Sequence, residues 1–90
     1  MEARRSVRVV NDSGLHARPC HAVVSTALAF DADLRVHNGA QEANGKSILE
    51  LMTLNAPRGT ELELIARGRD AEALVCALVV LFASGFEETS

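Results

Sequence analysis

An unbroken run of apolar residues at 73–83 limits the possible folds of this chain more than any other feature. The run is too short to cross a bilayer as a helix, which takes about 20 apolar residues, so it predicts a helix within a protein core and no insertion into a membrane. Asp70 precedes it as a candidate N-cap, and Glu72 lies in the first turn, where an acidic side chain complements the helix dipole. A chain of 90 residues can build one such core, and residues 1–90 are expected to form a single domain.

The layer that packs against this helix is predicted to be a β-sheet. Apolar and polar residues alternate, as in strands with one buried face, at 5–10, 33–37 and 61–66. Asn38-Gly39 follows the second of these segments and is a strong hairpin signal, because both residues tolerate a positive φ. A short strand is therefore expected to return at 41–43.

A first helix is expected at about 16–29, between the first two strands. Pro19 would lie in its first turn, where the missing N–H costs nothing because the first helical N–H groups have no intrahelical acceptor. The residues at helical spacing that would face the sheet are Cys20, Val23, Val24 and Ala27.

A second, short helix is expected after the third strand. Ser47 and Glu50 have the spacing of a capping box, which opens a helix. The residues that end it soon after Leu54 are Asn55, Pro57 and Gly59. The resulting order βαββαβα predicts an α+β fold, in which three helices cover one face of an antiparallel four-stranded sheet and leave the other face in water.

Charge and cysteine content narrow the classes of partner and compartment. The formal net charge is −3 and no run of Lys and Arg is present, which argues against nucleic acid as a partner. Residues 1–5 lead directly into a strand pattern without an apolar signal segment, so a cytoplasmic protein is expected. Cys20 and Cys76 lie among apolar residues at helical spacing, which favours two small buried side chains over a disulfide.

His16 lies where the chain passes from a loop into the first predicted helix. A helix N-terminus attracts phosphate-like anions, because its first N–H groups are unpaired and the dipole is positive there. The N–H groups of Ala17 and Arg18 are expected to point toward a group carried by His16, and the Arg18 guanidinium suits phosphate oxygens. Dipole and guanidinium both disfavour a cationic imidazole, so His16 is expected to be neutral and to attack phosphorus through a ring nitrogen.

A metal or cofactor is not expected at this position. His16, Cys20 and His21 are close on the helix, but divalent ions need three or four ligands, and no carboxylate or further cysteine joins them. His21 is interpreted as a surface residue, and His37 as a residue at a strand end without a chemical role.

Two separated motifs resemble one protein family. Asn-Asp-Ser-Gly-Leu-His-Ala-Arg-Pro at 11–19, followed by Asn-Gly-Lys-Ser-Ile-Leu-Glu-Leu-Met at 44–52, is similar to HPr, the histidine-containing phosphocarrier of the bacterial phosphoenolpyruvate-dependent sugar phosphotransferase system. The resemblance covers residues 6–86. It implies an open-faced β-sandwich, and a cytoplasmic carrier that holds a labile phosphoryl group rather than an enzyme that turns over substrate by itself.

The resemblance also implies roles for single residues. His16 corresponds to the histidine that accepts a phosphoryl group on Nδ1 from phosphorylated enzyme I and donates it to enzyme IIA domains, and Arg18 to the arginine that faces the phosphate. Ser47 corresponds to a serine that HPr kinase/phosphorylase modifies in many members, although a capping box explains a serine here equally well. The surface implied for docking of partners consists of Ala17, His21, Ile48, Leu49 and Met52.

The sequence departs from the family at two places. Cys20 stands where alanine is usual, which leaves a thiol one turn from His16. The last helix is more apolar than a two-layer domain requires, and self-association or an extra contact is expected from its valines, which are Val75, Val79 and Val80.

Two alternatives to sugar transport stay open from the sequence. The chain fits the carrier of a nitrogen-type or otherwise incomplete phosphotransferase chain whose end point is regulation. The helix N-terminus also fits a regulatory module that binds an anion or phosphorylated metabolite without covalent transfer. Acid-labile phosphate on His16 distinguishes a carrier from such a module.

Overall fold

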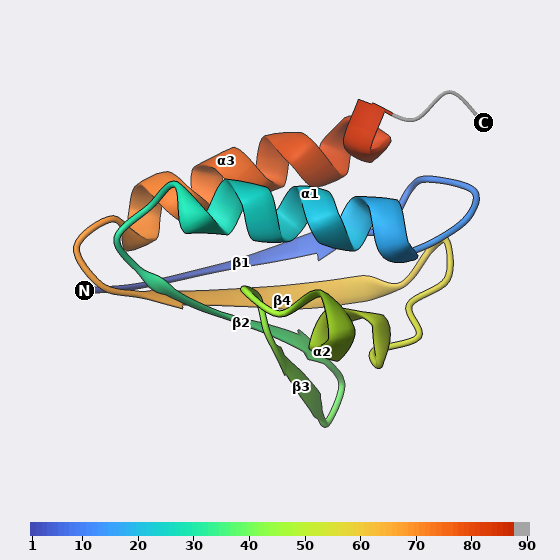
Figure 1. The fold of residues 1–90 in the computed structure, drawn as a ribbon, viewed down its shortest axis with the longest axis horizontal. Coiled ribbons are helices and arrows are strands. Elements are labelled where there is room, and N and C mark those ends of the chain that lie inside the picture. The colour runs from blue at the N-terminus through green and yellow to red at the C-terminus, as the bar shows by residue number, and fades with distance from the viewer. Residues whose placement is uncertain (88–90) are drawn as a thin grey trace.

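The protein folds into two layers, a four-stranded sheet and a layer of helices, in a computed structural model that describes residues 1–87 (Figure 1). The elements in chain order are β1 (Glu2–Arg8), α1 (Ala17–Leu28), β2 (Asp33–Asn38), β3 (Gln41–Asn44), α2 (Ile48–Met52), β4 (Glu61–Arg67), α3 (Ala71–Ala83) and the 3-10 turn η1 (Gly85–Glu87). All neighbouring strands are antiparallel, in the order β1-β4-β2-β3. The predicted α+β fold and its element order are confirmed.

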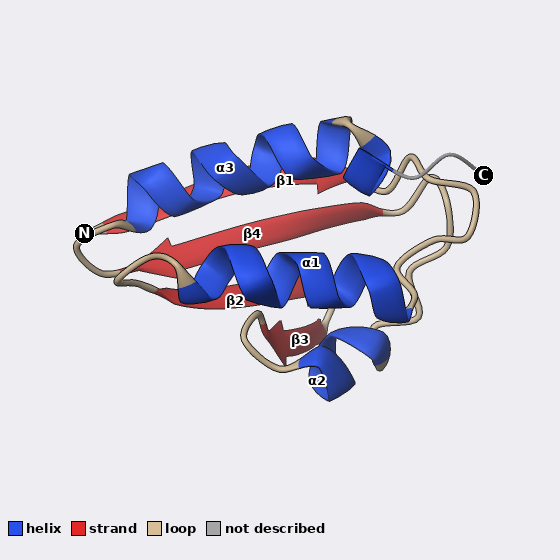
Figure 2. Ribbon diagram, turned by 45° about the horizontal axis from the view of Figure 1, so that its top comes forward, coloured by secondary structure: helices blue, strands red, loops and turns tan. Residues whose placement is uncertain are grey.

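The helices cover one face of the sheet and enclose the core. The helices α1 and α3 lie side by side across the sheet, and α2 continues this layer beside β3 and the first turns of α1 (Figure 2). Cys20, Val23 and Ala27 of α1 are fully buried, whereas Val24 is partly exposed at the edge of the predicted stripe. The largest fully buried side chains include Leu34, Leu51, Leu62, Leu64, Leu74, Leu78 and Phe82.

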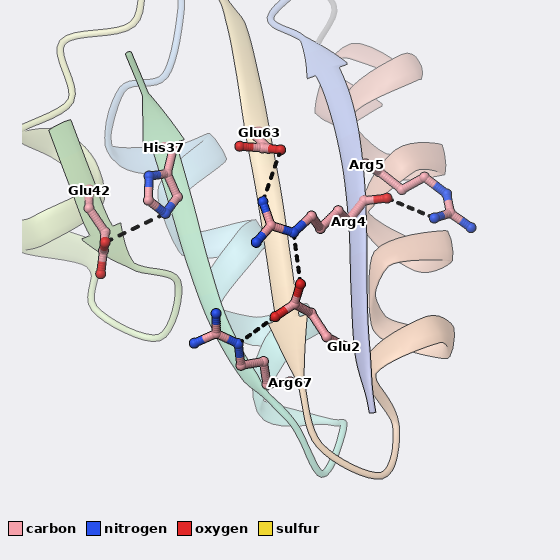
Figure 3. A network of polar contacts seen from close by, with 7 residues as sticks. All are labelled: Glu2, Arg4, Arg5, His37, Glu42, Glu63 and Arg67. Atoms are coloured by element: carbon pink, nitrogen blue, oxygen red, sulfur yellow. Dashed lines mark hydrogen bonds and ion pairs between the residues drawn. The ribbon is translucent and has the colours of Figure 1, made fainter. Parts of the chain in front are cut away.

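The other face of the sheet is covered by charged side chains (Figure 3). Glu2 accepts hydrogen bonds from Arg4 Nε at 2.8 Å and from Arg67 Nε at 2.7 Å, and these two donors lower the pKa of its carboxyl to about 2. Ile65 lies in register between Arg4 and Arg35 and is only 8% exposed, because the aliphatic stems of long side chains can cover an apolar neighbour. This face is wet, as predicted, with one buried apolar residue that simple alternation did not predict.

Two strand boundaries differ from the sequence-based prediction. Strand β1 begins at Glu2, where it pairs with Arg67, and it ends at Arg8 rather than residue 10. The hairpin is confirmed, but its two-residue loop is Gly39-Ala40, because Asn38 still pairs with Gln41. Gly39 has φ +60, which suits the first loop position of a tight hairpin. The Asn38 amide instead donates to the Leu54 carbonyl at 2.9 Å and ties the hairpin to the end of α2.

Asp70 occupies the N-cap position of α3, but its side chain does not cap the helix. The Asp70 carboxylate accepts the backbone N–H of Asp31 at 2.7 Å, and the Asp70 N–H donates to the Asp31 carbonyl at 3.0 Å. This reciprocal pair joins the start of α3 to the loop between α1 and β2. The predicted N-cap position is confirmed, but the Asp70 side chain serves a long-range contact instead of capping the helix.

Two predictions about the side chains of α3 are also wrong. Cys76 is exposed, because it lies on the side of the helix that faces away from the sheet, and its thiol lies 3.5 Å from a carboxylate oxygen of Glu72. Val75 is fully buried in the core and cannot belong to a surface patch, whereas Val80 is 69% exposed.

Within residues 1–87, no helix combines the length and apolar character needed to span a membrane.

Candidate functional site

His16 is the N-cap residue of α1. Its backbone is extended, with φ −94° and ψ −167°, and its carbonyl accepts the first helical hydrogen bond from Cys20 N at 3.0 Å. Its side chain makes no capping hydrogen bond and is half-buried. Its own N–H donates to the Gly14 carbonyl at 3.1 Å. The imidazole is thus held at the helix start without being used to close the helix.

The next three residues determine which N–H groups the helix presents. Ala17 and Arg18 occupy the first two helical positions, whose N–H groups have no acceptor within the helix, and Pro19 in the third position has no N–H. The start of α1 therefore presents the N–H groups of Ala17 and Arg18 together with the positive end of the dipole. The Arg18 side chain is exposed on the same turn. These are the residues that the sequence motif singled out.

The loop before His16 is fastened to the segment that follows α2. Leu15 N donates to the Ala56 carbonyl at 2.8 Å. Gly14 has φ +71, and a Cβ there would lie 2.6 Å from the Ala56 oxygen and 2.9 Å from Pro57 Cα, so only glycine fits. The residues at 55–57 predicted only the end of a helix, and this contact was not predicted. Gly14, two residues before His16, was the available signal in the sequence.

A surface cavity of about 400 Å³ opens beside His16. Its lining comes from the loop before α1, from the last residue of α2 and from the segment that follows α2. The lining residues are Ser13, Leu15, His16, Met52, Asn55, Ala56 and Pro57. Asn55 has φ +47, a conformation that asparagine adopts more readily than most residues. The cavity brings together two segments that are far apart in the sequence.

The residues expected to dock partners lie on α1 and α2, which contact each other (Figure 2), and Met52 also lines the cavity. Ala17 and His21 are exposed on α1. Leu49 is 79% exposed and Met52 40%, so both apolar side chains are accessible to a partner. Ile48 differs from the others, because it packs partly against the core.

Ser47 is the N-cap of α2, and its Oγ accepts the Glu50 N–H at 3.2 Å. The Glu50 carboxylate accepts the N–H of Asn44 at 2.9 Å instead of that of Ser47, which donates to the Asn44 carbonyl at 3.0 Å. The serine half of the predicted capping box is therefore confirmed, and the glutamate half reaches one turn further back. Both halves stabilise the start of α2.

Cys20 lies one turn after His16 but points into the core. Its side chain is fully buried, its Sγ lies 3.7 Å from the Leu15 carbonyl oxygen, and burial raises its pKa to about 11. No group of three or more His, Cys, Asp or Glu side chains within residues 1–87 could hold a metal ion.

The chain is similar to known phosphocarrier proteins over nearly its whole length. Residues 3–84 match a family described as "PTS HPr component phosphorylation site". Phosphocarrier protein HPr of Treponema pallidum is 39% identical over 84 residues, which is 93% of this chain and 96% of that protein. Phosphocarrier protein NPr of Escherichia coli K12 is 33% identical over 89 residues, or 98% of this chain and 99% of that protein. The crystal structure of HPr-C-His from Thermoanaerobacter tengcongensis superimposes with a TM-score of 0.92 at 35% identity, covering 98% of this chain and 99% of that one.

Proposed function

This chain belongs to the HPr family of phosphocarrier proteins, and on that premise we propose that His16 is the residue that carries the phosphoryl group. The observation that supports this most is the position of His16 at the N-cap of α1, with its side chain not engaged in capping. The group it would carry lies next to the N–H groups of Ala17 and Arg18, where a helix start attracts anions.

Transfer to His16 requires one bond to form and one to break. The neutral imidazole attacks phosphorus through the Nδ1 lone pair while the bond from phosphorus to the donor atom breaks, and its electron pair stays on the donor. The Nε2 proton stays in place throughout. Negative charge on the three phosphoryl oxygens is met by the two N–H groups, which the helix holds in place, and by the Arg18 guanidinium, which reaches them from the same turn.

The donor and acceptors that fit this carrier are enzyme I and enzyme IIA domains, acting in the cytoplasm. Their docking surface consists of exposed side chains of α1 and α2, namely Ala17, His21, Leu49 and Met52, with Ile48 partly buried beside them. Leu49 and Met52 are exposed apolar side chains, and patches of such side chains mark interaction sites. The carrier itself needs no cofactor for this transfer, because the donor supplies the phosphoryl group.

Ser47 is the proposed site of regulatory phosphorylation by HPr kinase/phosphorylase. Its hydroxyl lies at the N-terminus of α2, directly before Ile48 and Leu49. A phosphate there would be compatible with the helix dipole but would place about two negative charges on the docking surface. The effect would therefore fall on docking rather than on folding.

A nitrogen-type chain is the second candidate for the pathway. The relative NPr matches this chain over 98% of its length, so the resemblance to it is as complete as the resemblance to HPr. The two candidates differ in the end point of the chain, which is sugar uptake or regulation. Comparing transfer rates from this carrier to a sugar-type and to a regulatory enzyme IIA domain assigns the pathway by the faster acceptor.

The central test is phosphorylation by phosphoenolpyruvate and purified enzyme I. Acid-labile phosphate is expected on the parent protein and on His37→Ala, which alters a histidine of β2 outside the docking surface, and none on His16→Ala. His16→Ala should stay folded, because α1 is held mainly by packing. Label on His21 or His37 in the His16→Ala protein would contradict the assignment, and reversible phosphate binding without a covalent product would support the anion-binding module instead.

A further inference from the structure

We propose that Asn11 positions His16 for phosphoryl transfer, acting through the carbonyl oxygen of Gly14. This inference rests on the proposed role of His16 and concerns a residue to which neither the fold nor the motif assigns a function. Asn11 is the one polar residue among residues 1–87 that is buried, and its exposed fraction is 7%. A buried polar side chain is retained where its hydrogen bonds serve a purpose, because burial otherwise costs stability.

The contacts of Asn11 close the loop that leads to His16. Its Nδ2 donates to the Gly14 carbonyl at 2.6 Å, and the Gly14 N–H donates back to the Asn11 carbonyl at 3.1 Å. The same Gly14 carbonyl accepts the His16 N–H at 3.1 Å. A carbonyl oxygen has two lone pairs, so the two donors saturate it. Asn11 and His16 are therefore linked through one acceptor atom.

This link determines the direction in which His16 enters the helix. The Asn11 amide holds the Gly14–Leu15 peptide, whose oxygen accepts the His16 N–H and so constrains the backbone that carries the His16 side chain. Transfer between two proteins needs the attacking nitrogen aligned with the breaking bond, and a misplacement of about 1 Å can slow such a reaction roughly 100-fold. Removal of the amide should therefore affect the transfer step more than the binding of the donor.

The loop has a second attachment that does not depend on Asn11. Leu15 N still donates to the Ala56 carbonyl at 2.8 Å, and Leu15 is buried. Variants of Asn11 are thus expected to fold and to keep the loop packed against the protein. Their Gly14–Leu15 peptide is expected to be less restrained. Asn11→Asp keeps the size of the side chain and removes the donor, while Asn11→Ala removes both.

The test compares these two variants with Val75→Ala, which removes buried apolar volume from α3 without touching the loop. Steady-state transfer from phosphorylated enzyme I is measured at a temperature at which all proteins are folded by circular dichroism. Both Asn11 variants are expected to lower kcat about 10-fold at an unchanged KM for this carrier. Val75→Ala is expected to lower the melting temperature and leave kcat unchanged. The imidazole nitrogen resonances of His16 should shift in the Asn11 variants and not in Val75→Ala.

Each outcome bears on the inference. A parent-like kcat in both Asn11 variants, or a loss of kcat in Val75→Ala as large as theirs, would overturn the positioning role and leave the proposed function intact. A rise in KM with kcat unchanged would also overturn it, because Asn11 would then act on docking. Absence of acid-labile phosphate from the parent would overturn the proposed function, and the positioning role with it.

Discussion

The starts of α1 and α2 are the same structural element put to opposite uses. At the start of α2, the Ser47 hydroxyl accepts the Glu50 N–H and the Glu50 carboxylate accepts the Asn44 N–H, so the polar groups are paired within the chain. At the start of α1, His16 makes no side-chain cap, and no acidic residue lies in the first turn. One helix start is capped by its own side chains, whereas the other has no side-chain cap.

The two helix starts differ in what they contribute to the stability of the protein. An N-cap such as serine typically stabilises a helix by about 1 kcal/mol, and α1 forgoes that contribution. The uncapped start belongs to the longer helix, because α1 has 12 residues and α2 has 5. Sites that bind ligands commonly carry such a cost, because groups paired internally are not available to the ligand.

Giving α1 the kind of cap that α2 has is the strongest test of this comparison. His16→Ser should abolish acid-labile phosphorylation completely and raise the free energy of unfolding by about 1 kcal/mol, since a serine hydroxyl can accept an N–H of the first turn. Urea unfolding of the variant and the parent at neutral pH measures the gain. An unfolding free energy equal to or below that of the parent would show that α1 gains nothing from a serine cap, and would contradict the comparison with α2.

The side chain of Arg18 offers a smaller effect at the same helix start. Arg18→Ala should slow transfer from phosphorylated enzyme I about 10-fold, because one charge-assisted hydrogen bond to the phosphoryl group is lost while the two N–H groups remain. Arg18→Lys, which keeps the charge but not the planar fork, should fall between the two. Stopped-flow transfer rates provide the measurement. Equal rates for all three proteins would leave Arg18 as a solvated side chain.

Ser47 carries the smallest predicted effect and tests the capped helix start. Ser47→Asp should keep the stability of the parent, since aspartate is also a good N-cap, and slow transfer several-fold at low salt by placing a charge on the docking surface. Ser47→Ala is the matched control and should lose about 1 kcal/mol of stability with transfer unchanged. Parent-like transfer by Ser47→Asp would make Ser47 a helix cap without a regulatory part.

The elements and the helix starts that the sequence predicted correctly depend on local chemistry. The order of strands and helices follows from short-range periodicity, and the start of α2 from the spacing of Ser47 and Glu50. The placement of His16 at a helix N-cap followed from Pro19 and the apolar stripe behind it. In each case the residues that determine the feature lie within one or two turns of it.

The features that sequence missed depend on contacts between distant segments. Asp70 has the residue type and position of a cap, yet Asp31 of another loop takes its carboxylate. The hairpin loop is displaced by one residue because Asn38 pairs in the sheet and donates to Leu54. The contact of the site loop with Ala56 joins two segments about 40 residues apart, which no local pattern could predict.

The burial of Cys20 affects how the site responds to oxidants. A thiol reacts with peroxides through its thiolate, and with a pKa of about 11 on the order of one Cys20 in ten thousand is ionised at pH 7. The side chain is also fully covered by the core, so a peroxide has no direct path to the sulfur. The Cys20 thiol, one turn from His16, is thus kept from forming a sulfenic acid, and the proposed phosphoryl transfer through His16 is expected to persist under oxidising conditions that modify exposed thiols.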